Sequence, residues 1–105
     1  MRPGGDPNVA DRDGLCPLHL AAQQGCAEAA TLLLDAGADI DPVSLHGNTP
    51  LFVAVFNSRG DGTLIGLLRA RGADPFATNA HGQTPAGLAR LVANYSVAQF
   101  FADLD

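Results

Sequence analysis

The sequence contains no lysine and no tryptophan, and only one tyrosine among its 105 residues. Its six basic residues are therefore all arginines, and eleven acidic residues outnumber them, which gives a net charge of -5. Nucleic-acid backbones and anionic membrane surfaces repel a chain with this balance, and no arginine cluster offsets the total. We therefore expect neither a nucleic acid nor a membrane as a partner.

Long hydrophobic runs are also missing. The longest apolar run, LFVAVF at 51–56, is far shorter than the ~20 residues that span a bilayer. The first fourteen residues contain no apolar segment of the kind that signal peptides carry. We therefore expect a cytoplasmic protein.

The two cysteines, Cys16 and Cys26, are too few for a disulfide framework. We interpret them as small thiols within the core of a protein in a reducing compartment. A redox pair is the alternative, but a separation of ten residues is not a known redox spacing.

What the chain does contain is an internal repeat built on a shared Gly-x-x-Pro pattern. The aligned segments are DGLCPLHLAAQQG at 13–25, HGNTPLFVAVFNS at 46–58 and HGQTPAGLARLVA at 81–93. Their glycines are separated by 33 and then 35 residues. A second block recurs as GADIDP at 37–42, GADPFA at 72–77 and, more weakly, GGDPNV at 4–9.

Each part of the pattern has a physical role. Glycine suits a turn with positive φ, and Cys/Thr-Pro suits the first residues of a helix. A second helix is predicted over 26–36, with Ala29, Ala30, Leu32 and Leu33 pointing inward and Gly37 ending it. One such unit cannot bury its apolar face alone, so the units must stack. The sequence therefore predicts an all-α solenoid of about three helix-turn-helix units with hairpin loops.

This pattern resembles the ankyrin repeat, whose hallmark is a TPLHxAA stretch within a 33-residue unit. Here the stretch occurs as CPLHLAA at 16–22, TPLFVAV at 49–55 and TPAGLAR at 84–90. The resemblance implies antiparallel helix pairs with hairpins projecting at about right angles. It also implies that His19 ties its turn together through hydrogen bonds. Phe52 and Gly87 stand at the equivalent positions and cannot do so.

We expect a single ankyrin-repeat domain over 1–105. Its parts are the tail of an incomplete repeat at 4–13, a repeat at 14–46, a repeat with a two-residue insertion at 47–81, and a C-terminal capping repeat at 82–105. The cap is predicted from an apolar stripe formed by Val97, Phe100, Phe101 and Leu104. At the other end, the incomplete first unit predicts an uncovered apolar face. Either the natural protein starts earlier, or another copy or another protein covers this face.

The stretch FNSRGDG at 56–62 contains Arg-Gly-Asp, a cell-adhesion motif in exported proteins. Repeat spacing explains it as the lengthened turn between two helices, with Gly60 as the turn glycine and Asp61 as the cap of a helix that begins near 62–63. We therefore do not assign an adhesion role. Within this turn, which is lengthened by two residues, Asn57, Ser58 and Arg59 are instead expected to project as a contact.

No catalytic constellation is evident. A phosphate-binding loop would need a lysine, which the chain lacks. His46 and His81 occupy equivalent turns and are expected one repeat apart, too far to share a metal. Ser44 and His46 lack an evident acidic third member. We therefore expect no enzyme and no cofactor.

The resemblance also implies where a partner binds: at the hairpin tips and the inner face of the first helix of each repeat. Leu15, Leu45, Phe56 and Leu91 are apolar there, and an exposed apolar band marks an interface. Burial of Phe56 and Leu91 between repeats is the alternative. Carried over to this chain, the predicted protein-binding residues are Arg12, Asp13, Leu15, Gln23, Gln24, Leu45, His46, Asn48, Phe56, Asn57, Arg59, His81, Gln83 and Leu91.

These features predict a non-enzymatic protein–protein interaction module. The chain, especially 79–104, is similar to short bacterial ankyrin proteins found beside toxin genes, which implies an immunity protein that inhibits a cognate toxin. An acidic inhibitor suits a basic nuclease toxin through electrostatic steering. The alternative is a scaffold role, as a fragment of a longer ankyrin array or as a unit that self-associates through its incomplete N-terminal end.

Overall fold

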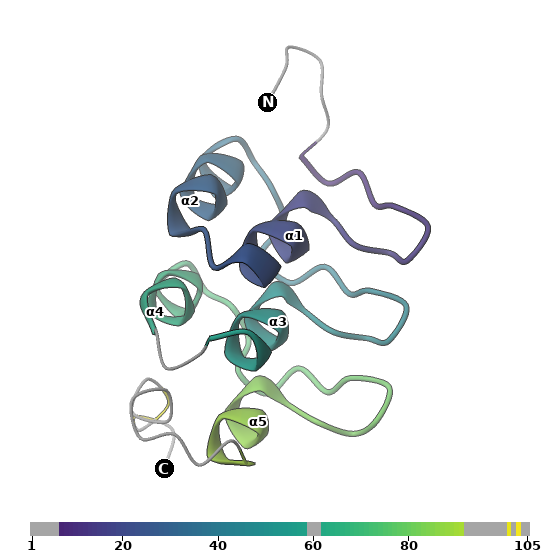
Figure 1. The fold of residues 1–105 in the computed structure, drawn as a ribbon, viewed down its shortest axis with the longest axis vertical. Helices are drawn as coiled ribbons and strands as arrows, with labels where there is room; N and C mark the ends of the chain where they lie inside the picture. Colours follow the sequence, from purple (N-terminus) through teal and green to yellow (C-terminus); the bar gives the residue numbers. More distant parts are fainter. Residues whose placement is uncertain (1–6, 59–61, 92–100, 102, 104–105) are drawn as a thin grey trace.

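The computed structural model describes residues 7–58, 62–91, 101 and 103. Within them the chain forms five α-helices and no strand: α1 Pro17–Gln24, α2 Ala27–Asp35, α3 Pro50–Phe56, α4 Thr63–Ala70 and α5 Pro85–Leu91. Figure 1 shows α1, α3 and α5 stacked in one column and α2 and α4 in a second. Three hairpin loops project from the first column to the same side. The predicted all-α solenoid of stacked helix pairs with projecting hairpins is therefore confirmed.

Local signals place the helix starts where the sequence predicts them. Thr49 Oγ1 accepts a hydrogen bond from the backbone N–H of Phe52, and Pro50 occupies the first helical position of α3. Thr84 Oγ1 accepts from the N–H of Gly87 in the same way at the start of α5. Both arrangements satisfy donors that a helix cannot satisfy within itself.

The hairpins are joined edge to edge by backbone hydrogen bonds. The N–H of Leu45 donates to the carbonyl of Asp13 at 3.0 Å, and the N–H of Ala80 donates to the carbonyl of His46 at 2.9 Å. The approach is so close that a Cβ on Gly47 would lie 2.8 Å from the nitrogen of Ala80. Gly47 also has a φ of 76°, a region that favours glycine. The three hairpins therefore form one continuous row.

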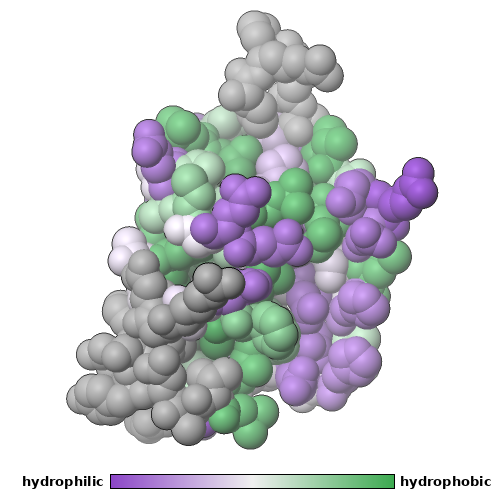
Figure 2. Space-filling view, in the orientation of Figure 1, coloured by the Kyte–Doolittle hydropathy of each residue, from purple (hydrophilic) through white to green (hydrophobic). Residues whose placement is uncertain are grey.

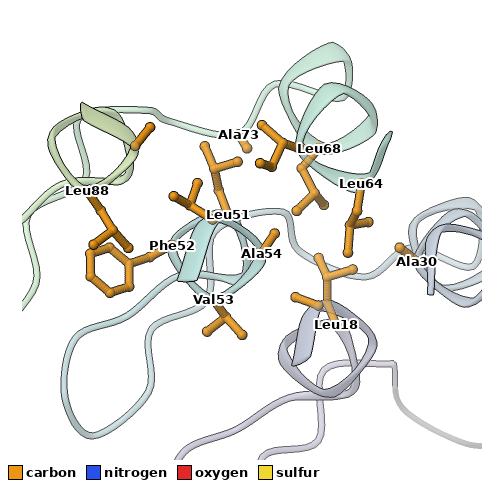
Figure 3. Close-up of a cluster of buried hydrophobic side chains, with 14 of the residues drawn as sticks. Leu18, Ala30, Leu51, Phe52, Val53, Ala54, Leu64, Leu68, Ala73 and Leu88 are labelled. Carbon is orange, nitrogen blue, oxygen red and sulfur yellow. The ribbon is translucent and has the colours of Figure 1, made fainter. Parts of the chain in front are cut away.

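The core lies between the two columns of helices. Its largest fully buried aliphatic side chains are Leu18 of α1, Leu51 of α3, and Ile65 and Leu68 of α4. In Figure 3, the small Ala54 of α3 points toward the side chains of Leu18 of α1 and Leu64 of α4, which lets the three helices approach each other. Full burial of each such leucine or isoleucine contributes about 1.5–3 kcal/mol.

The prediction that Leu32 points inward is wrong, since its side chain is 65% exposed. Leu67 holds the equivalent position on α4 and packs against the core, because α2 lies beside α4.

The first helices of the repeats show the same difference in exposure between equivalent residues. Leu20 on α1 is 42% exposed, whereas its equivalents Val53 on α3 and Leu88 on α5 are buried. In Figure 3 Val53 lies on the side of α3 that faces α1. Among the described residues, no helix covers α1 and α2 in the way that they cover α3 and α4.

Several predictions concern residues outside the described part of the chain. They include Arg59, Gly60 and Asp61 of the inserted turn, and Val97, Phe100 and Leu104 of the proposed cap. The described residue of that stripe, Phe101, is buried with the rest of the core. No helix in the described ranges is long and apolar enough to cross a membrane.

Candidate protein-binding groove

Two adjoining hollows lie between the hairpin row and the inner helices. The first measures about 460 Å³ and is lined by Gln23, Asn48, Phe52, Val53, Phe56 and Asn57. The second measures about 340 Å³ and is lined by Asp13, Leu15, Gln23, Ser44, His46, Asn48 and Val53. Because both share Gln23, Asn48 and Val53, they form one continuous depression, called the groove below.

The two walls of the groove come from different elements. Gln23 of α1 and Phe56 of α3 belong to the helical wall, and Asp13 and His46 belong to the hairpin wall. In Figure 2 hydrophilic side chains gather over the hairpins, and hydrophobic surface lies between them and the second column of helices. Both walls of the groove therefore combine polar and apolar side chains.

The floor is formed by Phe52 and Val53, which are almost fully buried. Phe56, one turn later on α3, is 70% exposed and stands at the rim. The sequence analysis did not include these two residues among the binding residues, because their apolar run at 51–56 indicates the hydrophobic core. The signal that could have found Phe52 is its place at the position where the first repeat has His19, at the base of a hairpin.

His19 is buried and supports the hairpin side of the groove through two hydrogen bonds. Its Nδ1 accepts from the N–H of Cys16 at 3.0 Å, so its Nε2 carries the proton and donates to the carbonyl of Asn48 at 2.7 Å. Burial lowers the pKa of His19, and so favours the neutral ring that these bonds require. The structural role expected for His19 is confirmed.

Asn48 is also held from the other side, because its Oδ1 accepts from Nδ2 of Asn79 at 2.9 Å. Its own Nδ2 and the amide of Gln23 have no hydrogen-bond partner among the described residues. Asn57 donates its Nδ2 to the carbonyl of Val53, so its side chain is held as well. The groove therefore offers the amide groups of Gln23, Asn48 and Asn57, the last two held by hydrogen bonds.

The predicted binding residues separate into three groups. Those that line the groove are Asp13, Leu15, Gln23, His46, Asn48, Phe56 and Asn57. Those that are exposed but line neither hollow are Arg12, Gln24, Leu45, His81, Gln83 and Leu91. Arg59 lies outside the described residues. The alternative that Phe56 and Leu91 are buried between repeats is wrong, since both side chains are exposed.

The two hairpin histidines stand on neighbouring repeats, as expected. The rings of His46 and His81 stack with their centroids 6.4 Å apart and their planes 23° apart, a contact that the sequence did not predict. The hairpins that carry them are joined by the bond between Ala80 and His46. In the described part of the chain, no three His, Cys, Asp or Glu residues cluster as a metal site.

Comparison with known proteins places this architecture in a family. The family model described as ankyrin repeats (3 copies) matches residues 1–79. The B-cell lymphoma 3 protein homolog of Mus musculus is 43% identical over 70 residues, which is 66% of this chain and 15% of that protein. The serine/threonine-protein kinase 12 of Arabidopsis thaliana is 36% identical over 94 residues, which is 90% of this chain and 19% of that protein. The chain therefore spans less than a fifth of the length of these relatives, both of which are eukaryotic.

Proposed function

The chain belongs to the ankyrin-repeat family, whose members are protein-interaction modules, and we propose that it binds a protein partner through the groove. The observation that carries this proposal is the union of two hollows into one groove, with Phe52 and Val53 as its floor and Phe56 exposed at its rim. An aromatic side chain exposed beside a desolvated floor is typical of the centre of an interface.

The mechanism is rigid surface complementarity without a covalent step. The backbone bonds between neighbouring hairpins and the His19 bond to Asn48 set the groove walls before a partner arrives. A preformed surface loses less conformational entropy on binding than a mobile one. The affinity then depends on how well the partner fills the floor and meets the amides.

The test is affinity capture from lysate of the source cells with the tagged chain as bait. It is run beside Phe56→Asp and the control Phe76→Asp, which changes another exposed phenylalanine that lines neither hollow of the groove. We expect a partner that binds the wild type and the control but not Phe56→Asp. Retention of the partner by Phe56→Asp would contradict the groove as the binding site.

A finer proposal concerns the partner: a basic toxin that the chain inhibits. It is supported by the acidic balance of the chain, by the carboxylate of Asp13 in the groove, and by the resemblance to proteins found beside toxin genes. Electrostatic steering predicts that the association rate falls as salt rises. Stopped-flow measurements from 50 to 500 mM NaCl test this with the captured partner, and a salt-independent rate would exclude a basic partner.

A second candidate function is a unit of a longer or self-associated stack. It is favoured by Leu20 and Leu32, which are exposed on α1 and α2 although their equivalents Val53 and Leu67 are covered by those same helices. The surface that would cover them is therefore a helix pair of the same kind. Light scattering with size exclusion tests self-association: we expect the wild type to form a dimer that Leu20→Ser with Leu32→Ser dissociates. A monomer at all concentrations would exclude self-association.

A further inference from the structure

The groove has no charged residue in the lining of one hollow and a carboxylate, Asp13, in the lining of the other, and this difference points to a ligand. We propose that its occupant is an extended peptide segment of the partner, with one apolar side chain seated between Phe52 and Phe56 and one arginine or lysine reaching Asp13. This inference rests on the proposed function, because it names the part of the partner that the groove holds.

The apolar end of the groove selects an uncharged anchor. The hollow there, about 460 Å³, contains no charged residue in its lining, and its size is within the ~300–1,000 Å³ typical of ligand pockets. A charged side chain placed against Phe52 and Val53 would lose its hydration without gaining an ion pair. A leucine or phenylalanine would instead bury apolar surface at about 25 cal/mol per Å².

The middle of the groove selects an extended backbone over a helix. Gln23 and Asn48 lie where the two hollows meet, and the side-chain amide of Gln23 and Nδ2 of Asn48 lack partners among the described residues. An extended segment presents unpaired N–H and C=O groups that both donors and acceptors of an amide can bind. A helix satisfies these backbone groups internally and would offer neither amide a backbone partner.

The hairpin end selects a positive charge. Asp13 is the one carboxylate that lines the groove within the described residues, and it is exposed and has no ion pair there. Its neighbours on the same hairpin, Asp11 and Arg12, cancel each other in charge, so the tip keeps a net charge of −1. His46 stands across from it on the next hairpin and adds no negative charge. A basic side chain is therefore complementary to this end.

The test uses fluorescein-labelled peptides with a fixed leucine and an arginine one to four serines away, measured by fluorescence anisotropy. Matched peptides carry glutamate in place of the arginine, or serine in place of the leucine. We expect the best arginine peptide to bind at least ~10-fold more tightly than the matched glutamate peptide. A tenfold change in Kd corresponds to only ~1.4 kcal/mol, which a single charge reversal near Asp13 can supply. The serine peptide should lose measurable binding.

Variants of the protein test separately the contact of the basic side chain with Asp13 and the contact of the apolar side chain with Phe56. Asp13→Asn should abolish the preference for arginine over glutamate while the leucine is still required, and Phe56→Ser should weaken all leucine peptides. Phe76→Ser, at an exposed phenylalanine outside the groove, is the control and should change neither. Equal binding of arginine and glutamate peptides, or a preference that survives Asp13→Asn, would overturn the proposal.

The peptide result also separates this inference from the proposed function. If no peptide binds but capture of a folded partner remains sensitive to Phe56→Asp, the extended-peptide occupant is wrong and the groove still binds a protein. If capture is insensitive as well, the groove itself is not the binding site. Unfolding curves in urea for each variant establish that a loss of binding is not a loss of fold.

Discussion

Arg69 and Asp103 form a bidentate ion pair, with Nη1 to Oδ1 at 2.6 Å and Nη2 to Oδ2 at 3.0 Å. The same guanidinium lies 5.5 Å from the centre of the Phe101 ring, whose side chain is only 2% exposed. One arginine of α4 therefore fastens two residues near the C-terminus to the core, one by charge and one by a cation–π contact.

This pair predicts a pH-dependent contribution to stability. The hydrogen bonds from Arg69 lower the pKa of Asp103, so the folded state binds its proton less readily than the unfolded state does. The stabilisation is therefore present above the ordinary aspartate pKa of about 3.9 and is lost as the pH falls through the lower folded value. We expect Asp103→Asn to have a lower urea midpoint than wild type at pH 7, and the difference to shrink at pH 3. Asp39→Asn, an exposed carboxylate without an ion pair among the described residues, is the control.

His19 predicts a dependence in the neutral range. Because burial lowers its pKa, the unfolded state takes up a proton first as the pH falls. Stability is thus complete above the ordinary histidine value of about 6.5 and declines below it, by at most ~1.4 kcal/mol per pH unit. We expect His19→Gln to be less stable at pH 7.5 and to lose this slope between pH 7 and 5. The double variant His46→Gln with His81→Gln retains His19 and should keep the slope; its disappearance there would contradict the assignment.

The close approach of neighbouring hairpins predicts that alanine substitution destabilises the protein unequally at two glycines with the same φ angle. Gly47 and Gly82 both have a φ of 76°, so alanine at either position costs about 1–2 kcal/mol of left-handed strain. Only at Gly47 would the new Cβ also lie 2.8 Å from Ala80, whereas nothing stands within 4 Å at Gly82. We expect Gly47→Ala to lower the free energy of unfolding by more than Gly82→Ala, measured in urea at pH 7. Equal losses would mean that the hairpins separate without cost.

The inserted turn predicts an effect on binding alone. Asn57 lines the groove and donates to the carbonyl of Val53, and it precedes the residues that exceed the repeat length. We expect a chain with Asn57–Arg59 shortened by two residues to fold with an unchanged urea midpoint but to bind its partner more weakly. Isothermal titration with the captured partner measures this, and an unchanged affinity would show that the insertion is not a contact.

The sequence alone determined the helices and their repeat, because the signals involved act within a few residues. Thr-Pro at 49–50 and at 84–85 starts a helix in both places, and the glycine three residues before each proline permits the turn. His19 could be assigned a structural role on the same grounds, from the resemblance of its stretch to a known motif. Half of the predicted binding residues also line the groove, since hairpin tips and inner helix faces follow from the repeat register.

Only the tertiary structure decided which apolar residues are core and which are surface. Leu20 and Val53 read alike in the sequence, yet Leu20 is 42% exposed and Val53 is 8% exposed, because a neighbouring helix covers one and not the other. The place of Phe52 in the groove floor and the stacking of His46 on His81 also depend on how neighbouring repeats are arranged. Burial and contact between repeats depend on residues about 33 positions away, and no local pattern carries that information.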